Sequence, residues 1–499
     1  MHNSMKKVLA AIAVIFLITI SISCGESGGF RAGAAAVDIT PQAWPIPMSG
    51  TFDFRPATGA HDPLHARALV LDDGTTKLAI VLIDNVGIQR ELLDEAKRLA
   101  SEASGIPANR MLMAATHTHS APPTRVEDIA LRWPKESLPA DSDRLALYDQ
   151  AVEANRQYVE YLTKQIAVAV EQATRNLEPA EIGWAVGDLP DHLNNRRWYR
   201  KAGTIPPDPF GGTTDRVQMN PPVASPDLIE PAGPVDPGLS VVSVRTRRGE
   251  PLALLANYSL HYVGGTPAQQ ISADYFGEFA RQIQQRLGAG EKFVGILSNG
   301  TSGDVNNINF REARGRREPF EQIRFVAGSV ADKAFEAYKT IRHLRDADLA
   351  MAERELILDL RKPSAEQLKF AKAALAAKDE KKLPRNAKAY ARRAVAAAEG
   401  PASVEIKLQA IRIGGLGIVA LPFETFTETG LEIKQKSPLK PTFTVELANG
   451  SNGYLPTPEQ HALGGYETWL GTSRVEIQAS RKITDTLLEL LHQIGHPGS

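Results

Sequence analysis

The sequence has 499 residues, of which 43% are hydrophobic and 23% are charged, so it can form a large packed core. This composition excludes a disordered chain and a membrane protein with many spans. The 57 basic and 58 acidic residues give a net charge of −1, which provides no basic field to hold nucleic acid. The single cysteine excludes an internal disulfide and a cysteine-rich zinc cluster. A metal site in this chain must therefore use His, Asp, Glu or Tyr.

The first residues have the pattern of an export signal. Two lysines precede an apolar run over residues 8–20, which is too short to span a membrane as a helix. We interpret residues 1–23 as a signal peptide and Cys24 as a site of lipid attachment after cleavage. Residues 24–32 then form a flexible tether. The protein is expected to be an exported lipoprotein on the periplasmic or cell-surface side of the envelope, held to a membrane by its lipid. The alternative is a secreted protein in which Cys24 is incidental.

Apolar runs alternate with amphipathic segments in the part of the chain that follows. Residues 78–83 and 111–115 have the pattern of strands that are buried on both faces. Residues 91–103 and 145–175 have helical periodicity. The alternation predicts an α/β fold with mixed sheets covered by helices, and it places a catalytic site at the carboxyl ends of strands.

The central part of the chain continues the alternation. Strands are predicted at residues 239–245, 251–257 and 293–297, with a helix at 276–287. Residues 187–237 are rich in Pro, Gly, Asp and Asn, which predicts a long irregular loop of the kind that often carries function.

Two further segments are predicted to be helical. Residues 363–400 consist mainly of Ala and Lys and contain Pro384, so we expect an exposed helical insertion that breaks at this proline. Residues 476–494 are expected to form a helix near the end of the chain.

Polar side chains follow several of the apolar runs. Asp84 ends one run, His117 and His119 follow the next, His261 follows a third, and residues 299–307 follow a fourth. On an extended chain, two histidines spaced by two residues project from one face. They could bind one divalent metal together, or one could bind it while the other transfers protons. The alternatives are a hydrogen-bonded histidine pair near a turn and, for His261, an ordinary core histidine.

The segment ATHTHSAP, residues 115–122, resembles the Thr-His-Thr-His-Ser-Gly-Pro motif of the neutral ceramidases. Further segments resemble motifs of that family in the expected order, at residues 33–41, 59–74, 195–197, 257–274, 422–424 and 454–467. We therefore interpret residues 33–499 as a ceramidase-like catalytic domain. The β-sandwich domain that usually follows in this family is expected to be absent.

The resemblance implies a zinc site. Its ligands would be His117, His261, Glu424 and Tyr454, and neutral imidazoles with a carboxylate are a common ligand set for catalytic zinc. Tyr454 is the unusual member, because a phenol has an ordinary pKa near ~10 and must lose its proton to bind a metal. The alternative for Tyr454 is a core tyrosine with a hydrogen-bonded hydroxyl.

The resemblance also implies roles around the metal. His119 would act as general acid and base, Tyr466 would donate a hydrogen bond to the oxyanion, and Arg196 would contact the substrate or the oxyanion. For Arg196 the alternative is a salt bridge within the loop. Asn306 stands where the family has a serine that is proposed as a nucleophile. An amide cannot form an acyl-enzyme, so water activated by the metal must attack directly.

These expectations describe a zinc-dependent amidohydrolase that cleaves an N-acyl linkage, with a ceramide-like sphingolipid as the expected lipid substrate. One alternative is a zinc hydrolase for another amide or ester of the cell envelope. The other is a non-catalytic surface lipoprotein that retains the fold.

Overall fold

The computed structural model of the chain describes residues 29–50, 52–138, 142–313, 315 and 317–495. The predicted signal peptide and Cys24 lie outside the described residues. Among the helices of the described part, none combines the length and the apolar character that crossing a membrane requires.

Two β-sheets form the centre of the molecule. The larger is mixed and eight-stranded, in the order β16-β14-β13-β8-β1-β5-β6-β7, and the smaller is four-stranded, in the order β18-β19-β20-β22. The strands of the larger sheet are β1 (Arg31–Asp38), β5 (His65–Asp72), β6 (Lys77–Ile83), β7 (Met111–Ala115), β8 (Glu178–Asp188), β13 (Gly238–Thr246), β14 (Pro251–Tyr258) and β16 (Val294–Asn299). Those of the smaller sheet are β18 (Leu349–Asp359), β19 (Ser403–Ile413), β20 (Leu416–Ala420) and β22 (Thr442–Val445).

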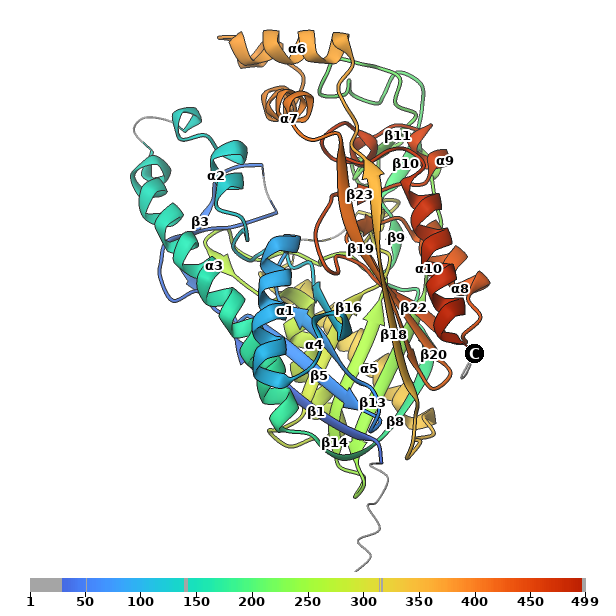
Figure 1. Cartoon of the computed structure of the whole chain (residues 1–499). Coiled ribbons are helices and arrows are strands. Elements are labelled where there is room, and N and C mark those ends of the chain that lie inside the picture. Colours follow the sequence, from blue (N-terminus) through green and yellow to red (C-terminus); the bar gives the residue numbers. More distant parts are fainter. Residues whose placement is uncertain (1–28, 51, 139–141, 314, 316, 496–499) are drawn as a thin grey trace, which may run out of the picture.

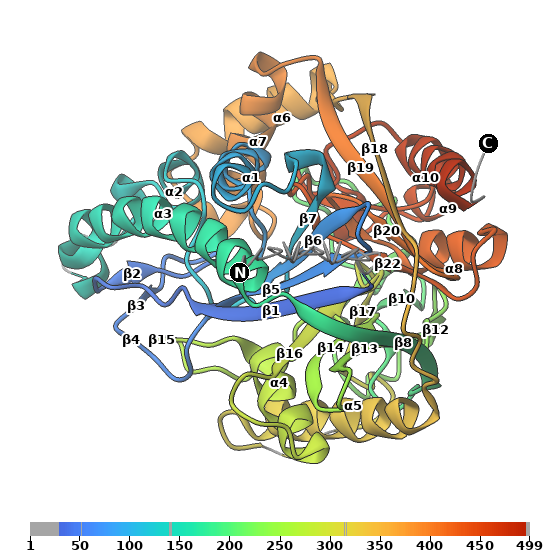
Figure 2. The same cartoon turned by 60° about the horizontal axis from the view of Figure 1, so that its bottom comes forward.

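Helices cover the outer face of each sheet, which gives four layers (Figures 1 and 2). The larger sheet is covered by α1 (Arg90–Ser104), α3 (Asp143–Arg175), α4 (Asp274–Leu287) and α5 (Glu321–Thr340). The smaller sheet is covered by α8 (Thr427–Lys436) and α10 (Ala479–Gly495). The mixed α/β fold predicted from the sequence is confirmed.

Strand β6 shows why the sequence of these strands is apolar throughout. Its residues Leu78, Ile80 and Leu82 pack between the two sheets. The alternate residues Ala79, Val81 and Ile83 pack under the helices α1 and α3. Successive side chains of a strand point to opposite faces, so a strand with a hydrophobic core on each side must be apolar at every position.

The predicted elements are observed with small changes at their ends. The four predicted helices outside the insertion correspond to α1, α3, α4 and α10, and the five predicted strands to β6, β7, β13, β14 and β16. Helix α3 buries Leu162, Ile166 and Val170, which are spaced by four residues along one face. The helical periodicity of the sequence is therefore the periodicity of this buried face.

The segment 187–237 is more ordered than predicted. It contains the short strands β9 (Asn194–Asn195), β10 (Arg197–Arg200), β11 (Val217–Met219) and β12 (Leu228–Pro231). Strand β10 lies between β11 and β12, and β9 pairs with β17 (Val305–Asn306). The prediction of an entirely irregular loop is wrong, because these backbone pairings fix the segment against the rest of the molecule.

The segment 363–400 forms two helices at one end of the molecule (Figure 1). Helix α6 (Ala365–Ala376) is largely exposed, with Ala371 and Ala374 buried. Helix α7 (Ala387–Glu399) buries Tyr390, Ala391 and Ala394.

The other α-helices and strands are short: α2 (Glu127–Arg132), α9 (Pro458–His461), the pair β2 (Ile46–Pro47) with β3 (Pro56–Ala57), the pair β4 (Gly59–Ala60) with β15 (Gln270–Ile271), and the pair β21 (Glu424–Thr425) with β23 (Tyr454–Leu455).

Residues 446–449, which follow β22, connect the two edges of the larger sheet. The Asn449 N–H donates to the carbonyl of Met113 in β7 at 2.8 Å. The Glu446 N–H donates to the carbonyl of Asn299 in β16 at 3.3 Å. Because β7 and β16 are the opposite edges of this sheet, the sheet must curl until both edges reach the same segment. The curvature brings the carboxyl ends of β7 and β14 close together.

Candidate active site

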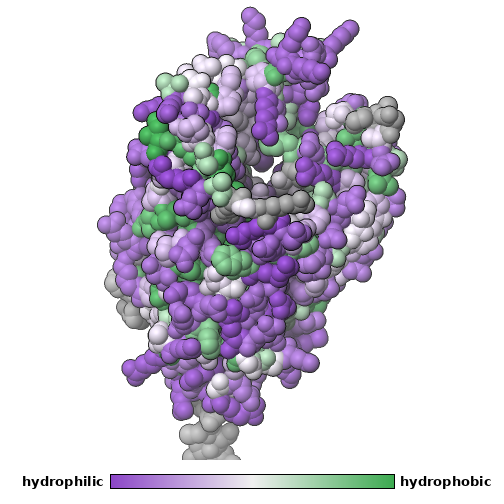
Figure 3. All heavy atoms as spheres, turned by 180° about the vertical axis from the view of Figure 1, so that it is seen from behind, coloured by the Kyte–Doolittle hydropathy of each residue, from purple (hydrophilic) through white to green (hydrophobic). Residues whose placement is uncertain are grey.

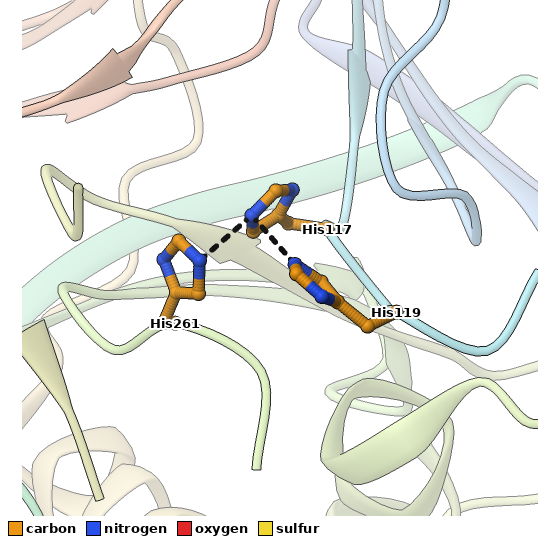
Figure 4. Close-up of side chains that lie close together, drawn as sticks. All are labelled: His117, His119 and His261. Atoms are coloured by element: carbon orange, nitrogen blue, oxygen red, sulfur yellow. Dashed lines mark hydrogen bonds between the residues drawn. The ribbon is translucent and has the colours of Figure 1, made fainter. Parts of the chain in front are cut away.

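Three histidines from the ends of two strands converge on one point (Figure 4). His117 and His119 follow β7, and His261 follows β14. The Nε2 atom of His117 lies 3.0 Å from Nε2 of His261 and 3.1 Å from Nε2 of His119. One ligand atom from each of the three rings falls within 4.8 Å of the others, which is close enough for one metal ion. The three rings therefore form a candidate metal centre.

The backbone at His117 differs from the extended chain that the sequence predicts. His117 has φ of 72°, in the left-handed region, and its N–H donates to the carbonyl of Asn85 at 2.8 Å. The chain is therefore not extended at this position, and the rings of His117 and His119 are perpendicular. A non-glycine residue in this region is strained, and such strain persists where the surrounding structure holds it. The expectation of two rings on one face of an extended chain is wrong.

The second nitrogen of each ligand ring identifies its tautomer. Nδ1 of His117 lies 2.5 Å from the carbonyl of Val86, and Nδ1 of His261 lies 3.1 Å from the carbonyl of Ser302. A carbonyl only accepts hydrogen bonds, so each Nδ1 carries a proton, and in the neutral form of each ring Nε2 presents a lone pair. Two lone pairs at 3.0 Å repel each other, and a cation between them removes the repulsion. This arrangement fits a bound metal.

Glu424 supplies an oxygen at the same point. Its Oε2 atom lies 3.4 Å from Nε2 of His117 and 3.7 Å from Nε2 of His261. Strands β21 and β23 pair in parallel with Glu424 opposite Tyr454, so the backbone places these two predicted ligands side by side. The Tyr454 hydroxyl bonds to Glu424 and accepts a hydrogen bond from Arg196 Nη2 at 2.9 Å.

The electrostatics of the centre differ between its groups. Burial by itself lowers the pKa of His117, but Glu424 outweighs burial and raises it, so a metal that binds Nε2 must displace a proton there. Burial lowers the pKa of His261 well below its usual value, so this imidazole is neutral. Burial by itself raises the pKa of Glu424, but His117 outweighs burial and lowers it, so the carboxylate is ionised. Buried imidazole nitrogens with one carboxylate oxygen are ligands that zinc prefers, and both His119 and Tyr454 lie close enough to complete the set.

Arg196 is held beside the centre by a buried ion pair. Its Nε donates to Glu467 at 3.2 Å and its Nη2 to the carbonyl of Gly303 at 2.7 Å. Arg197 Nη1 donates to the other oxygen of Glu467 at 2.7 Å. Burial by itself lowers the pKa of Arg196, but the adjacent Tyr454 and Glu467 outweigh it and raise the pKa. Arg196 thus makes a salt bridge and also contacts a predicted ligand.

Two buried carboxylates of the site are absent from the sequence prediction. Glu467 is the first, although it follows the predicted Tyr466 directly. The second is Glu446, which accepts hydrogen bonds from the Ser302 hydroxyl and from the Thr425 N–H. Burial raises the pKa of Glu446 to about 7. Glu446 directly follows β22, whose sequence Thr-Phe-Thr-Val alternates polar and apolar residues, so the rule that found polar residues after apolar runs missed it.

Asn306 lies in strand β17, away from the residues that line the cavity over the candidate centre. Its side-chain Nδ2 donates to Asn220 at 2.7 Å, and its Oδ1 accepts from the Ile308 N–H at 2.9 Å. The side chain thus connects neighbouring loops through both of its polar atoms.

A cavity of about 570 Å³ opens over the candidate metal centre. His117, His119, Glu424, Tyr454 and the predicted Tyr466 all line it. Helix α7 contributes part of its wall, and the molecule is hollowed below the helices at the top of Figure 3. The cavity wall also includes the apolar residues Phe52, Leu131, Trp133, Leu470 and Val475.

The chain is similar in sequence and in structure to a neutral ceramidase. Over 316 residues, 62% of this chain, it is 22% identical to the neutral ceramidase of Pseudomonas aeruginosa. The aligned region is 42% of that protein, so the chain spans less than half the length of the relative it matches. A search of family models found no match.

Two solved structures share the fold. The crystal structure of neutral ceramidase from Pseudomonas aeruginosa aligns with a TM-score of 0.67 and 18% identity, over 94% of this chain and 75% of the other. A ceramidase complexed with C2 aligns with a TM-score of 0.66 and 18% identity, over 94% and 76%. The predicted resemblance to the neutral ceramidases is confirmed, and the chain has their fold over nearly its whole length.

Proposed function

We propose that this protein is a zinc-dependent amidohydrolase that cleaves the N-acyl linkage of a lipid-like substrate. The observation that carries the proposal is the convergence of three imidazole nitrogens and the Glu424 carboxylate in a cavity with apolar walls. The similarity to neutral ceramidase supports amide hydrolysis as the reaction. Zinc is the proposed ion because the donor set consists of nitrogen and oxygen ligands in a small, buried site.

His117, His261 and Glu424 would hold the ion together with Tyr454. Zinc bound there would supply the Lewis acidity that activates water and polarises the amide carbonyl. Arg196 keeps the Tyr454 hydroxyl directed at Glu424 through the hydrogen bond to its oxygen.

Three residues beside the ligands would act on the substrate. His119 stacks on Tyr262 with ring centres 3.7 Å apart, which fixes the imidazole in position to deliver a proton to the leaving amine. Tyr466 lines the cavity and would donate a hydrogen bond to the carbonyl oxygen as it becomes negative. Arg196 would stabilise the same charge.

Water would attack the amide carbonyl directly. Asn306 stands where the resemblance places a nucleophilic serine, and its amide is already engaged with Asn220 and Ile308. The C–N bond breaks as His119 protonates the nitrogen, and the products are a fatty acid and an amine.

We further propose that lipid on Cys24 holds the enzyme at a membrane of the cell envelope, close to lipid substrates.

The test combines metal analysis of the purified protein with hydrolysis of a panel of N-acyl lipids. His117→Ala and His261→Ala are each expected to lose zinc and activity together, because a missing ligand opens the site. His119→Ala is expected to keep its zinc and to lose roughly 10²–10⁴-fold in turnover, the usual contribution of a general acid. Asn306→Ala is the matched control, with zinc retained and a milder loss of turnover.

Three results would contradict the proposal. Full zinc occupancy in both His117→Ala and His261→Ala would exclude these residues as ligands. Loss of zinc in His119→Ala would make His119 a ligand instead of the proton donor. A covalent acyl adduct, detected by mass spectrometry during turnover, would exclude direct attack by water.

A further inference from the structure

The cavity over the candidate metal centre is lined by many more cations than anions. Five arginines line it, and among the described residues its only carboxylates are those of Asp128 and Glu424. The whole chain has a net charge of −1, so this concentration of positive charge is local. The arginines come from separate parts of the chain: Arg125, Arg132, Arg361, Arg393 and Arg474.

Most of these arginines lack an acidic partner. Within the part of the chain that the structure describes, Arg125 is the one member that forms an ion pair, with Glu127 at 3.8 Å. Arg361 donates to the backbone carbonyls of Thr468 and Ser473 at 2.7 and 3.2 Å. Guanidinium groups in a partly enclosed site are normally paired with carboxylate, so their ligand is expected to be an anion.

Arg132 and Arg474 are the arginines most open to a ligand. Among the described residues, neither side chain has a hydrogen bond or an ion pair. The side chain of Arg474 is open to solvent, although protein atoms lie close around it. Both observations fit a side chain that projects into the cavity. Burial lowers the pKa of Arg474, and Arg393 and Arg132 lower it further. Asp128 and Glu424 oppose this effect on Arg474, but burial and the two arginines outweigh them. The three guanidinium groups thus lie close enough to repel one another, and a further anion between them would reduce the repulsion.

The structure also holds Arg393 in place. Its guanidinium lies over the rings of Phe52 and Tyr390, 5.6 and 4.9 Å from their centres. Gly471 has φ of 89°, and a Cβ atom there would lie 3.0 Å from Cβ of Arg393. The glycine allows helix α7 to approach the segment that carries Arg474. A flexible cation held in this way is preorganised for a ligand.

We infer that the substrate is an anionic N-acyl amphiphile, in which the amine bears a carboxylate, sulfonate or phosphate group. This inference rests on the proposed amide hydrolysis and specifies its substrate class. Guanidinium groups bind these oxyanions through paired hydrogen bonds, whereas a neutral headgroup would leave the arginines unpaired. The apolar wall formed by Leu131, Trp133 and Leu470 would receive the acyl chain.

The test compares two substrates of nearly the same size with the zinc-loaded full-length protein. N-lauroylglycine carries a carboxylate, and N-lauroylethanolamine carries a hydroxyl in its place. We expect kcat/KM to be at least about 10-fold higher for N-lauroylglycine, as charge-assisted hydrogen bonds imply. This preference should weaken as salt is raised from about 0.02 to about 0.5 M, because salt screens charges. N-lauroyltaurine and an N-lauroyl phosphoethanolamine distinguish sulfonate and phosphate from carboxylate.

Variants connect the preference to the arginines. Arg474→Gln and Arg132→Gln are each expected to reduce the ratio of kcat/KM values, anionic over neutral, by about 10- to 100-fold. Arg392→Gln is the matched control, because Arg392 is adjacent to Arg393 on α7 but does not line the cavity. It should leave the ratio unchanged.

Equal or faster hydrolysis of N-lauroylethanolamine would overturn the inference while leaving the amide hydrolase intact. An unchanged ratio in both Arg474→Gln and Arg132→Gln would also overturn it. If neither substrate is hydrolysed, the proposed reaction fails, and calorimetric titration still tests the anion site. Tighter binding of N-lauroylglycine than of N-lauroylethanolamine would support the site, and equal binding would refute it.

Discussion

The charged amine of Lys97, on helix α1, is buried, and its burial destabilises the folded protein. We therefore expect the free energy of unfolding to depend on pH. The Lys97 side chain is 1% exposed, and Nζ donates to Asn449 Oδ1 at 2.7 Å. Burial is the main cause that lowers its pKa from 10.5 to about 7, and Lys407 contributes to this shift against the opposing effects of Glu353 and Asp94. We expect Lys97→Met, which keeps most of the length of the side chain and removes its charge, to stabilise the protein at neutral pH.

The magnitude follows from the pKa. A fall from 10.5 to about 7 corresponds to about 5 kcal/mol of unfavourable free energy when the amine is charged. Below pH about 7, the Lys97 amine is protonated in both the folded and the unfolded state, and the folded state is destabilised by this full amount. Between about 7 and 10.5 the unfolded state binds more protons, so the free energy of unfolding rises with pH by about 1.4 kcal/mol per pH unit. Above that range the cost is absent.

The substitution also removes a hydrogen bond. Leaving Asn449 Oδ1 without its donor costs about 1–3 kcal/mol. Lys97→Met is therefore expected to be about 2–4 kcal/mol more stable than the natural protein at pH about 6, and the advantage should disappear near pH about 9. At higher pH the natural protein should be the more stable, because its neutral amine keeps the hydrogen bond.

Urea unfolding followed by circular dichroism, at pH values from about 6 to about 9.5, measures this difference. Arg98→Met is the matched control, since Arg98 is adjacent on α1 and its side chain is 52% exposed. The control should leave the stability unchanged at every pH, because its side chain stays in solvent. A difference between Lys97→Met and the natural protein that does not vary with pH would refute the reasoning.

Two further predictions concern the site and its location. Glu467→Gln leaves the buried Arg196 and Arg197 without their carboxylate, so urea unfolding should show a loss of about 3–5 kcal/mol, and unchanged stability would contradict the importance of this pair. Cys24→Ser should move the protein from the membrane fraction to the soluble fraction, because one lipid-bearing residue is the proposed anchor. Identical fractionation of the two proteins would exclude lipid anchoring through Cys24.

The sequence alone contained most of the local structure of this protein. Residues 78–83 predict a strand because both of its faces meet hydrophobic cores, and residues 145–175 predict a helix because one face of α3 is buried. The motif at residues 115–122 pointed to His117 and His119 as candidates, and the same resemblance pointed to Glu424 and Tyr454. The structure places Glu424 and Tyr454 beside each other. Local patterns report which faces of an element are buried, and such patterns extend over a few residues.

The assembly of the site was decided by the tertiary structure. His117 and His261 lie 144 residues apart in the sequence, and they meet where the larger sheet curls so that residues 446–449 reach both of its edges. The left-handed backbone of His117 and the burial of Glu446 depend on the same packing.

The charge of the cavity depends on packing as well. Arg132, Arg361, Arg393 and Arg474 come from segments that no local pattern relates to one another. Strand order and curvature depend on how two sheets and their helices bury apolar surface together, which is a property of the whole chain. The sequence therefore determined the elements and the residue types that could perform chemistry, and only the packing of the layers determined which of them share one cavity.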